Sequence, residues 1–116
     1  MNIVVTGGCG FIGSSFVNYL YENVDCDITV IDKLTYASNP KLIPSDVELI
    51  KADICKIEEE DIYEADYIVN FAAESHVDNS ISNGKPFIKT NVMGTLSLLQ
   101  AAKEHWNGNF SNKLFT

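Results

Sequence analysis

The sequence of 116 residues lacks any apolar run approaching the roughly 20 residues of a membrane-spanning helix. Cations are few: eight lysine and arginine residues against sixteen aspartate and glutamate residues give a formal charge of −8. No basic patch stands out, which argues against binding nucleic acid through its phosphates. No basic leader precedes the first apolar segment. We therefore expect a cytoplasmic protein whose partners are small molecules or proteins, with neither nucleic acid nor membrane among them.

Cysteine is scarce as well. The three cysteines, Cys9, Cys26 and Cys55, are odd in number and form no C-x-x-C pair, which predicts reduced, buried thiols and no metal site. Internal repeats, low-complexity runs and linkers are missing, and the length fits one domain. An apolar share of 46% and a charged share of 21% are typical of a soluble globular protein.

Residues 6–13, TGGCGFIG, carry the most informative pattern. They follow the apolar run Ile3 to Val5, place glycines at Gly7, Gly10 and Gly13, and lead into a helical apolar pattern. Strand, tight turn and helix N-terminus in this order are typical of a dinucleotide-phosphate site. The glycines allow the backbone to approach a pyrophosphate, and free N–H groups of the first helical turn point at the anion. An ordinary glycine-rich turn is the alternative.

The rest of the chain alternates between strand and helix patterns. We predict strands at 2–6, 27–32, 47–50, 67–71 and 113–116, and helices at 11–23, 56–64 and from Pro86 to Trp106, with a loop and a short helical turn in 33–46. The last helix is expected to bury the apolar stripe Ile88, Val92, Leu96, Leu99, Ala102 and Trp106. Alternation of this kind predicts an α/β fold with a doubly wound parallel, Rossmann-like sheet of strand order 3-2-1-4-5, which breaks off at the fifth strand.

Two strand ends carry acidic residues. Asp32 follows Gly13 by nineteen residues and can accept hydrogen bonds from both adenosine ribose hydroxyls while repelling a 2′-phosphate, which favours NAD over NADP. The neighbouring Lys33 could offset that repulsion. Asp53 and Ile54 follow the third strand, where an adenine would lie. For both aspartates, an ordinary strand-ending turn is the alternative.

The fourth strand leads into the run Phe71, Ala72, Ala73, Glu74, Ser75 and His76, beside the switch point of the sheet. The two alanines leave room for a cofactor, and Ser75 and His76 face the expected substrate cleft. For His76 a hydrogen-bonded loop residue is the favoured interpretation over a general base. Thr90 and Asn91 either solubilise the long helix or brace the cofactor.

These segments resemble the extended short-chain dehydrogenase/reductase family. The matching pieces are TGGCGFIG at 6–13, DKLTYASN at 32–39, ADI at 52–54, NFAAESHVDNSI at 70–81 and TNVMGT at 90–95. Within the family, AAESHVD together with DKLTYA is typical of nucleoside-diphosphate-sugar dehydratases. Cys9, Ser38 and Asn79 depart from its usual alanine, glycine and arginine.

The resemblance implies an NAD site and a role for each matching residue. The pyrophosphate would contact Gly7, Gly10, Phe11, Ile12 and Gly13. The adenosine ribose would contact Asp32, Lys33, Leu34 and Thr35, and the adenine would contact Asp53 and Ile54. The middle of the cofactor would be lined by Phe71, Ala72, Ala73 and Glu74, with Thr90 near the nicotinamide half and Ser75 at the nucleotide sugar. The implied substrate is dTDP-glucose, and the implied full-length enzyme is a homodimer.

The implied reaction is an internal redox cycle: NAD takes a hydride from carbon four, water leaves across carbons five and six, and the hydride returns to carbon six. The family's Thr-Asp-Glu, its Tyr-x-x-x-Lys pair and its sugar-binding domain do not occur in residues 1–116. We therefore expect an incomplete NAD-binding domain with no catalytic residues, inactive and unstable, aggregated or paired when alone. Another nucleotide-sugar epimerase or dehydratase, and a non-catalytic NAD-binding module, are the alternatives.

Overall fold

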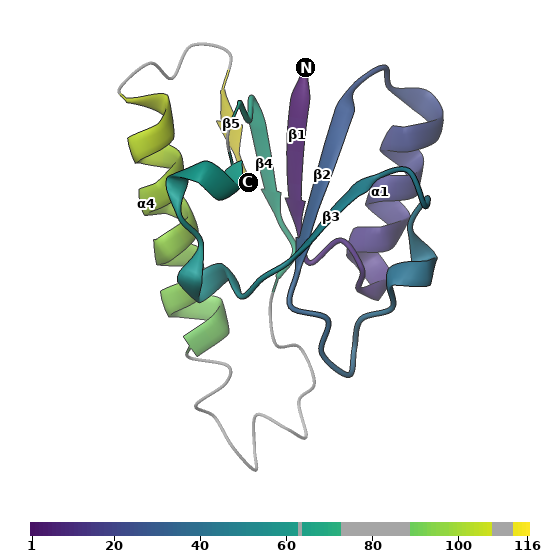
Figure 1. The fold of residues 1–116 in the computed structure, drawn as a ribbon, viewed down its shortest axis with the longest axis horizontal. Helices are drawn as coiled ribbons and strands as arrows, with labels where there is room; N and C mark the ends of the chain where they lie inside the picture. The colour runs from purple at the N-terminus through teal and green to yellow at the C-terminus, as the bar shows by residue number, and fades with distance from the viewer. Residues whose placement is uncertain (63, 73–88, 108–112) are drawn as a thin grey trace.

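The computed structural model describes residues 1–62, 64–72, 89–107 and 113–116 (Figure 1). Five parallel strands form one sheet in the order β3-β2-β1-β4-β5. They are β1 (Asn2–Thr6), β2 (Asp27–Asp32), β3 (Glu48–Lys51), β4 (Tyr67–Asn70) and β5 (Leu114–Phe115). The predicted fold class and strand order are confirmed. The bounds of β1 and β2 are as predicted, and those of β3, β4 and β5 differ by one residue at the ends that changed.

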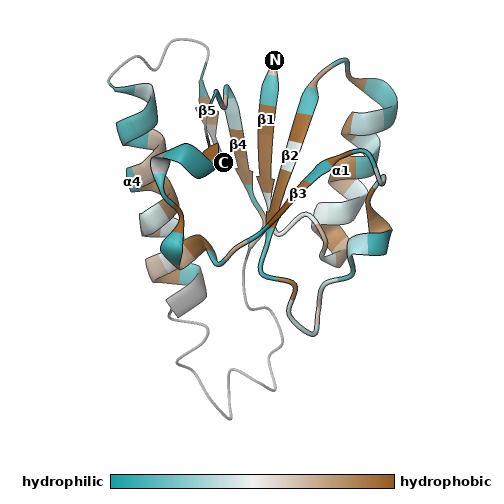
Figure 2. Ribbon diagram, in the orientation of Figure 1, coloured by the Kyte–Doolittle hydropathy of each residue, from teal (hydrophilic) through white to brown (hydrophobic). Residues whose placement is uncertain are grey.

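Helices cover both faces of the sheet. Helix α1 (Phe11–Asn23) lies on one face, and helix α4 (Thr95–Trp106) lies on the other (Figure 1). Alternate residues of β1 point to opposite faces: Ile3 and Val5 pack in the core beneath α1, whereas Val4 packs in the core beneath α4. The middle of β1 is therefore apolar on both faces, as the brown segment in Figure 2 shows, because helices cover both sides of the sheet there.

The predicted short helix over 56–64 is realised only in part, as a 3₁₀ helix and not as one continuous α-helix. Two short 3₁₀ turns stand there, η2 (Ile54–Lys56) and η3 (Glu59–Ile62). The Asp53 side chain accepts from the N–H of Cys55, and the Asp61 side chain accepts from the N–H of Glu58 (both 2.9 Å). Each of these side-chain bonds starts a separate short turn. Because the side chains bond to backbone N–H groups here, the segment forms two turns and not one continuous α-helix.

The long helix also differs from the prediction. Its first described residues, Lys89–Gly94, form a π-helical segment, which continues as α4. The sheet-facing side of α4 is made of Leu98, Ala101, Ala102 and Trp106, whereas the predicted stripe members Val92, Leu96 and Leu99 are 43–59% exposed. Ile88 lies outside the described residues.

Small residues explain which side of α4 is buried. A Cβ atom at Gly94 would lie 2.5 Å from the side chain of Ile54, so a larger residue here would force the Ile54 side chain to move. Ala101 and Ala102 are buried on the same side of the helix, and Trp106 Nε1 donates to the carbonyl of Ala65 (2.8 Å). Asn107, in the left-handed conformation with φ of 44°, ends the helix as predicted.

Loop 33–46 contains the predicted short helical turn, η1 (Pro40–Leu42). Within the described ranges, no helix combines the length and the apolar character that crossing a membrane requires.

Candidate functional site

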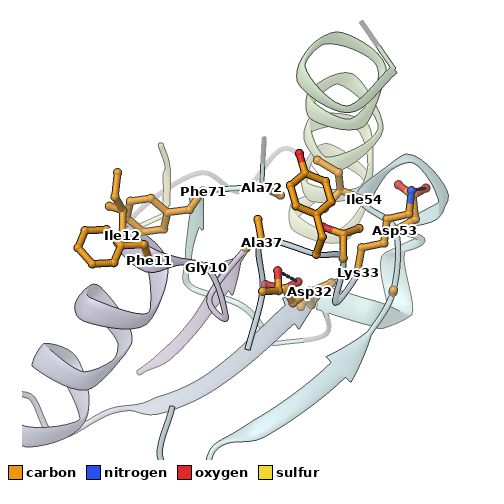
Figure 3. Close-up of a pocket in the computed structure, with 17 residues that line it drawn as sticks. Gly10, Phe11, Ile12, Asp32, Lys33, Ala37, Asp53, Ile54, Phe71 and Ala72 are labelled. Carbon is orange, nitrogen blue, oxygen red and sulfur yellow. Dashed lines mark hydrogen bonds and ion pairs between the residues drawn. The ribbon is translucent and has the colours of Figure 1, made fainter. Parts of the chain in front are cut away.

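A cavity of about 620 Å³ opens at the carboxyl ends of β1 to β4 (Figure 3). Twelve of the residues predicted to hold a cofactor line it: Gly7, Gly10, Phe11, Ile12, Gly13, Asp32, Lys33, Thr35, Asp53, Ile54, Phe71 and Ala72. They come from four separate chain segments, each of which lies at or just after the end of a strand. The sheet topology therefore brings most of the predicted site together.

The glycine turn after β1 is packed against the start of the loop after β4. Gly7 has a φ of 69°, and a Cβ atom there would lie 2.6 Å from the backbone nitrogen of Ala72. Its N–H donates to the carbonyl of Ile31 (2.8 Å), which ties the turn to β2. A Cβ atom at Gly13 would overlap the carbonyl oxygen of Gly7. Both positions require glycine for backbone packing alone.

The same turn presents the N-terminus of α1 to the cavity. Gly10 is the N-cap residue, and no side chain caps this helix end. The first helical bond runs from Ser14 N–H to the Gly10 carbonyl (2.9 Å), so the N–H groups of residues 11–13 are not used inside the helix. Those N–H groups and the positive end of the helix dipole suit an anion.

Asp32 joins the two loops that form the cavity wall. Its side chain is buried, and Oδ2 accepts from the N–H of Cys9 (2.9 Å). Oδ1 accepts from the N–H of Leu34 (2.8 Å) and from Ser38 Oγ (2.9 Å). All three donors are uncharged. A carboxylate has about four acceptor positions, so capacity remains for a ligand hydroxyl.

Leu34 is the one predicted cofactor residue with a described side chain that does not line the cavity. Its side chain packs against the core beneath α1, and its φ of 59° turns the backbone N–H toward Asp32. The structure therefore gives Leu34 a local structural contact and no direct place at the cavity.

Asp53 and Lys33 form an ion pair on the cavity wall. Lys33 Nζ lies 3.5 Å from Asp53 Oδ2, and the Lys33 side chain is 55% exposed against 15% for Asp53. Asp53 Oδ1 accepts from the N–H of Cys55, which fixes the carboxylate at the start of η2. Figure 3 shows Lys33 and Asp53 together on one side of the cavity, beside Ile54.

At the end of β4, the Asn70 side chain links β1 to the start of the next loop through two hydrogen bonds. Asn70 Oδ1 accepts from Thr6 Oγ1 (2.5 Å) and from the N–H of Ala72 (3.2 Å). Phe71 contacts Phe16 of α1 with ring centroids 5.4 Å apart.

Several predicted positions are not placed at the cavity. Ala73, Glu74, Ser75 and His76 lie outside the described residues, as does the side chain of Thr90, whose backbone belongs to the π-helical segment.

Sequence reasoning missed five lining residues: Ile31, Tyr36, Ala37, Ser38 and Ala52. Tyr36 to Ser38 belong to the run 32–39, one of the pieces that match the family, and that match could have predicted their place at the cavity. The N–H of Ser38 donates to the carbonyl of Thr35 (3.0 Å), and that of Asn39 donates to the carbonyl of Cys9 (2.9 Å). These bonds fold the loop toward the glycine turn, and this contact is what brings the three residues to the cavity.

The cysteines are free thiols. Burial, and then the charge of Asp32, raise the pKa of Cys9 to about 11, so this thiol stays protonated at neutral pH. In the part of the chain that the structure describes, no group of three or more His, Cys, Asp or Glu residues could hold a metal ion.

Residues 3–115 match the NAD dependent epimerase/dehydratase family. The dTDP-glucose 4,6-dehydratase of Escherichia coli is 44% identical over 117 residues, which cover 93% of this chain and 32% of that protein. The chain spans about a third of the length of the curated relatives it matches.

Two solved structures are also similar. DesIV, a dTDP-glucose 4,6-dehydratase from Streptomyces venezuelae solved with NAD and TYD bound, is 41% identical with a TM-score of 0.82, covering 90% of this chain and 36% of that one. UDP-glucose 4-epimerase from Thermotoga maritima, solved with UDP-glucose, is 31% identical with a TM-score of 0.81, covering 90% of this chain and 35% of that one.

Proposed function

Because the chain belongs to the NAD-dependent epimerase/dehydratase family, we propose that its cavity binds NAD and that residues 1–116 form the cofactor-binding part of a dTDP-glucose 4,6-dehydratase. One observation supports this most strongly. An uncapped helix N-terminus, a glycine turn and a buried aspartate with spare acceptor capacity meet at one cavity.

Each part of the cavity suits a part of NAD. The pyrophosphate would accept from N–H groups at the start of α1, because this helix end offers donors and positive potential. The adenosine ribose would donate to Asp32. The adenine would lie beside Ile54, with Asp53 accepting from its exocyclic amine.

The remaining assignments extend the same proposal. Phe71 and Ala72 would border the middle of the cofactor, together with Ala73 and Glu74. Thr90 would lie near the nicotinamide half, and Ser75 would contact the nucleotide sugar. The whole protein would work in the cytoplasm as a homodimer.

NAD would supply the hydride acceptor and donor of the redox cycle. The residues of this chain would bind and orient it: Asp32 fixes the ribose and the turn after β1 fixes the pyrophosphate. None of the five tyrosines is followed four residues later by lysine, so residues 1–116 contain no Tyr-x-x-x-Lys pair for proton transfer. We expect this chain alone to bind NAD without forming a 4-keto sugar from dTDP-glucose.

A nucleotide-sugar epimerase is the second candidate, favoured by the likeness to the Thermotoga maritima epimerase. The codons that follow Thr116 in the gene discriminate between the two. A Thr-Asp-Glu run after β5 would support dehydration, and its absence would support the epimerase. A non-catalytic NAD-binding module would be supported by NAD binding without turnover in a chain that ends at Thr116 in the cell.

Calorimetric titration with NAD tests the binding proposal. We compare Asp32→Asn with Asp46→Asn, which removes the same charge from an exposed residue bonded to the Tyr21 hydroxyl, outside the cavity. Asp32→Asn should weaken binding by about tenfold or more, since hydrogen bonds to a charged acceptor contribute about 1.5–3 kcal/mol each. Asp46→Asn should bind like the unmodified chain. Equal affinity in both variants, or no binding by the folded unmodified chain, would contradict the proposal.

A further inference from the structure

Among the described residues that line the cavity, Lys33 is the single cation, and it follows directly after Asp32. This places opposite charges next to each other in the chain at the proposed ribose end. Asp32 would repel the 2′-phosphate of NADP, whereas an available Lys33 ammonium group would attract it. Which dinucleotide is preferred therefore depends on where the Lys33 charge is held.

The observed contacts separate these two charges. The Lys33 ammonium group lies 3.5 Å from the Asp53 carboxylate, whereas Asp32 accepts from three uncharged donors, the N–H groups of Cys9 and Leu34 and the Ser38 hydroxyl. Asp53 is itself anchored, since its other oxygen accepts from the Cys55 N–H and its side chain is only 15% exposed. The Asp53 carboxylate is therefore the fixed member of the ion pair, and the long, half-exposed Lys33 side chain extends to it.

We propose that Asp53 is a specificity-determining residue that favours NAD over NADP by holding the Lys33 ammonium group away from the adenosine ribose. This inference rests on the proposed NAD site and adds a role for the ion pair within it. With Asp53 charged, Lys33 is neutralised and the Asp32 charge meets the ribose unopposed. Without that charge, the flexible lysine side chain is able to turn toward a 2′-phosphate.

The variants Asp53→Asn and Asp53→Ser remove the negative charge of Asp53, so they test the effect of that charge. Both keep a side-chain oxygen that accepts from the Cys55 N–H, because Asn and Ser are good caps. Asp53→Glu keeps the charge and serves as the matched control. The double variant Asp53→Asn with Lys33→Met removes the released cation while retaining most of the apolar stem.

The measurement is the ratio of the NADP and NAD dissociation constants, obtained by calorimetry on the 116-residue chain. We expect the ratio to fall by about fivefold in Asp53→Asn and in Asp53→Ser, through tighter NADP binding, which is the upper end for an exposed ion pair. The ratio should return to its original value in the double variant and stay near it in Asp53→Glu. The change should shrink as salt is added.

A merely structural role for Asp53 would weaken both dinucleotides equally and leave the ratio unchanged. An unchanged ratio in both uncharged variants, or an equal fall in the double variant, overturns the inference while leaving the NAD site intact. Failure of the unmodified folded chain to bind either dinucleotide overturns the proposed function itself. The two failures are therefore distinguishable.

Discussion

Replacing Gly7 by alanine should damage the fold, whereas the same replacement at Gly10 should damage only ligand binding. At Gly7 the φ of 69° is unfavourable for a residue with a Cβ atom, and that atom would lie 2.6 Å from the backbone nitrogen of Ala72. At Gly10 the φ is −78°, and a Cβ atom would meet only the Gly7 carbonyl oxygen at 3.4 Å. Because both glycines belong to one turn, the Gly7→Ala and Gly10→Ala variants serve as controls for each other.

The magnitude at Gly7 follows from two terms. The left-handed conformation costs about 1–2 kcal/mol for a non-glycine residue. Crowding against backbone atoms, which cannot rotate away, adds about 1–3 kcal/mol. The sum of about 2–5 kcal/mol is a large share of the roughly 5–15 kcal/mol that stabilises a domain. At Gly10 the allowed φ and ordinary contact predict a change within about 0.5 kcal/mol.

Urea unfolding followed by far-UV circular dichroism measures both free energies, and calorimetry measures NAD binding. Gly7→Ala should lower the unfolding free energy by the amount above. Gly10→Ala should unfold like the original chain but bind NAD at least tenfold more weakly, because its Cβ atom would enter the proposed pyrophosphate position. Equal stability of Gly7→Ala and the original chain, or equal destabilisation by both variants, would refute this reasoning.

Three further predictions concern other parts of the molecule. Trp106→Phe should cost about 1–3 kcal/mol in urea unfolding, because the buried carbonyl of Ala65 loses its donor; unchanged stability would contradict the packing of α4. The Lys113 ammonium group, 2.7 Å from Asp66, and a backbone N–H of β1 hold the pKa of Asp66 below its ordinary value. A depressed carboxyl pKa stabilises the fold above the unfolded value of about 3.9 and loses that stabilisation as the pH falls through the folded value; Asp66→Asn should flatten the stability profile in this acid range, and an identical profile would count against the contact. A disulfide reagent at pH 8 should modify Cys9 far more slowly than the other two cysteines until urea is added, owing to its burial and its pKa of about 11; equal rates in the native protein would show that Cys9 is accessible.

The strand order was predictable because its causes are local. Continuous apolar runs such as Ile3 to Val5 mark strands buried on both faces, and alternating helices make those strands parallel. The buried side of α4 was not predictable in the same way. Leu96 and Leu99 compete with Leu98 and Ala102 as equally apolar sides of one helix. The outcome depends on contacts between distant segments, above all Gly94 against Ile54.

The candidate site also contains residues that the sequence predicts and residues that it does not. The glycine spacing and the position of Asp32 were predictable from the sequence, because both belong to one strand–turn–helix–strand unit. Ser38 and the Lys33–Asp53 pair were not, since their positions depend on how loop 33–46 folds against the turn at Cys9 and against η2. Leu34 was expected at the cofactor because it belongs to the run DKLTYASN on which the family resemblance rests, but its left-handed backbone directs the side chain into the core.

The central claim is that NAD binds with its pyrophosphate at the start of α1 and its adenosine at Asp32. A titration of the ¹⁵N-labelled chain with NAD, followed by amide resonances, tests this most directly. The account predicts saturable shifts that are largest at residues 10–13, 32–35 and 53–54, with little change at the distal end of α1. Absence of shifts in the folded chain, or shifts centred outside the cavity, would contradict it.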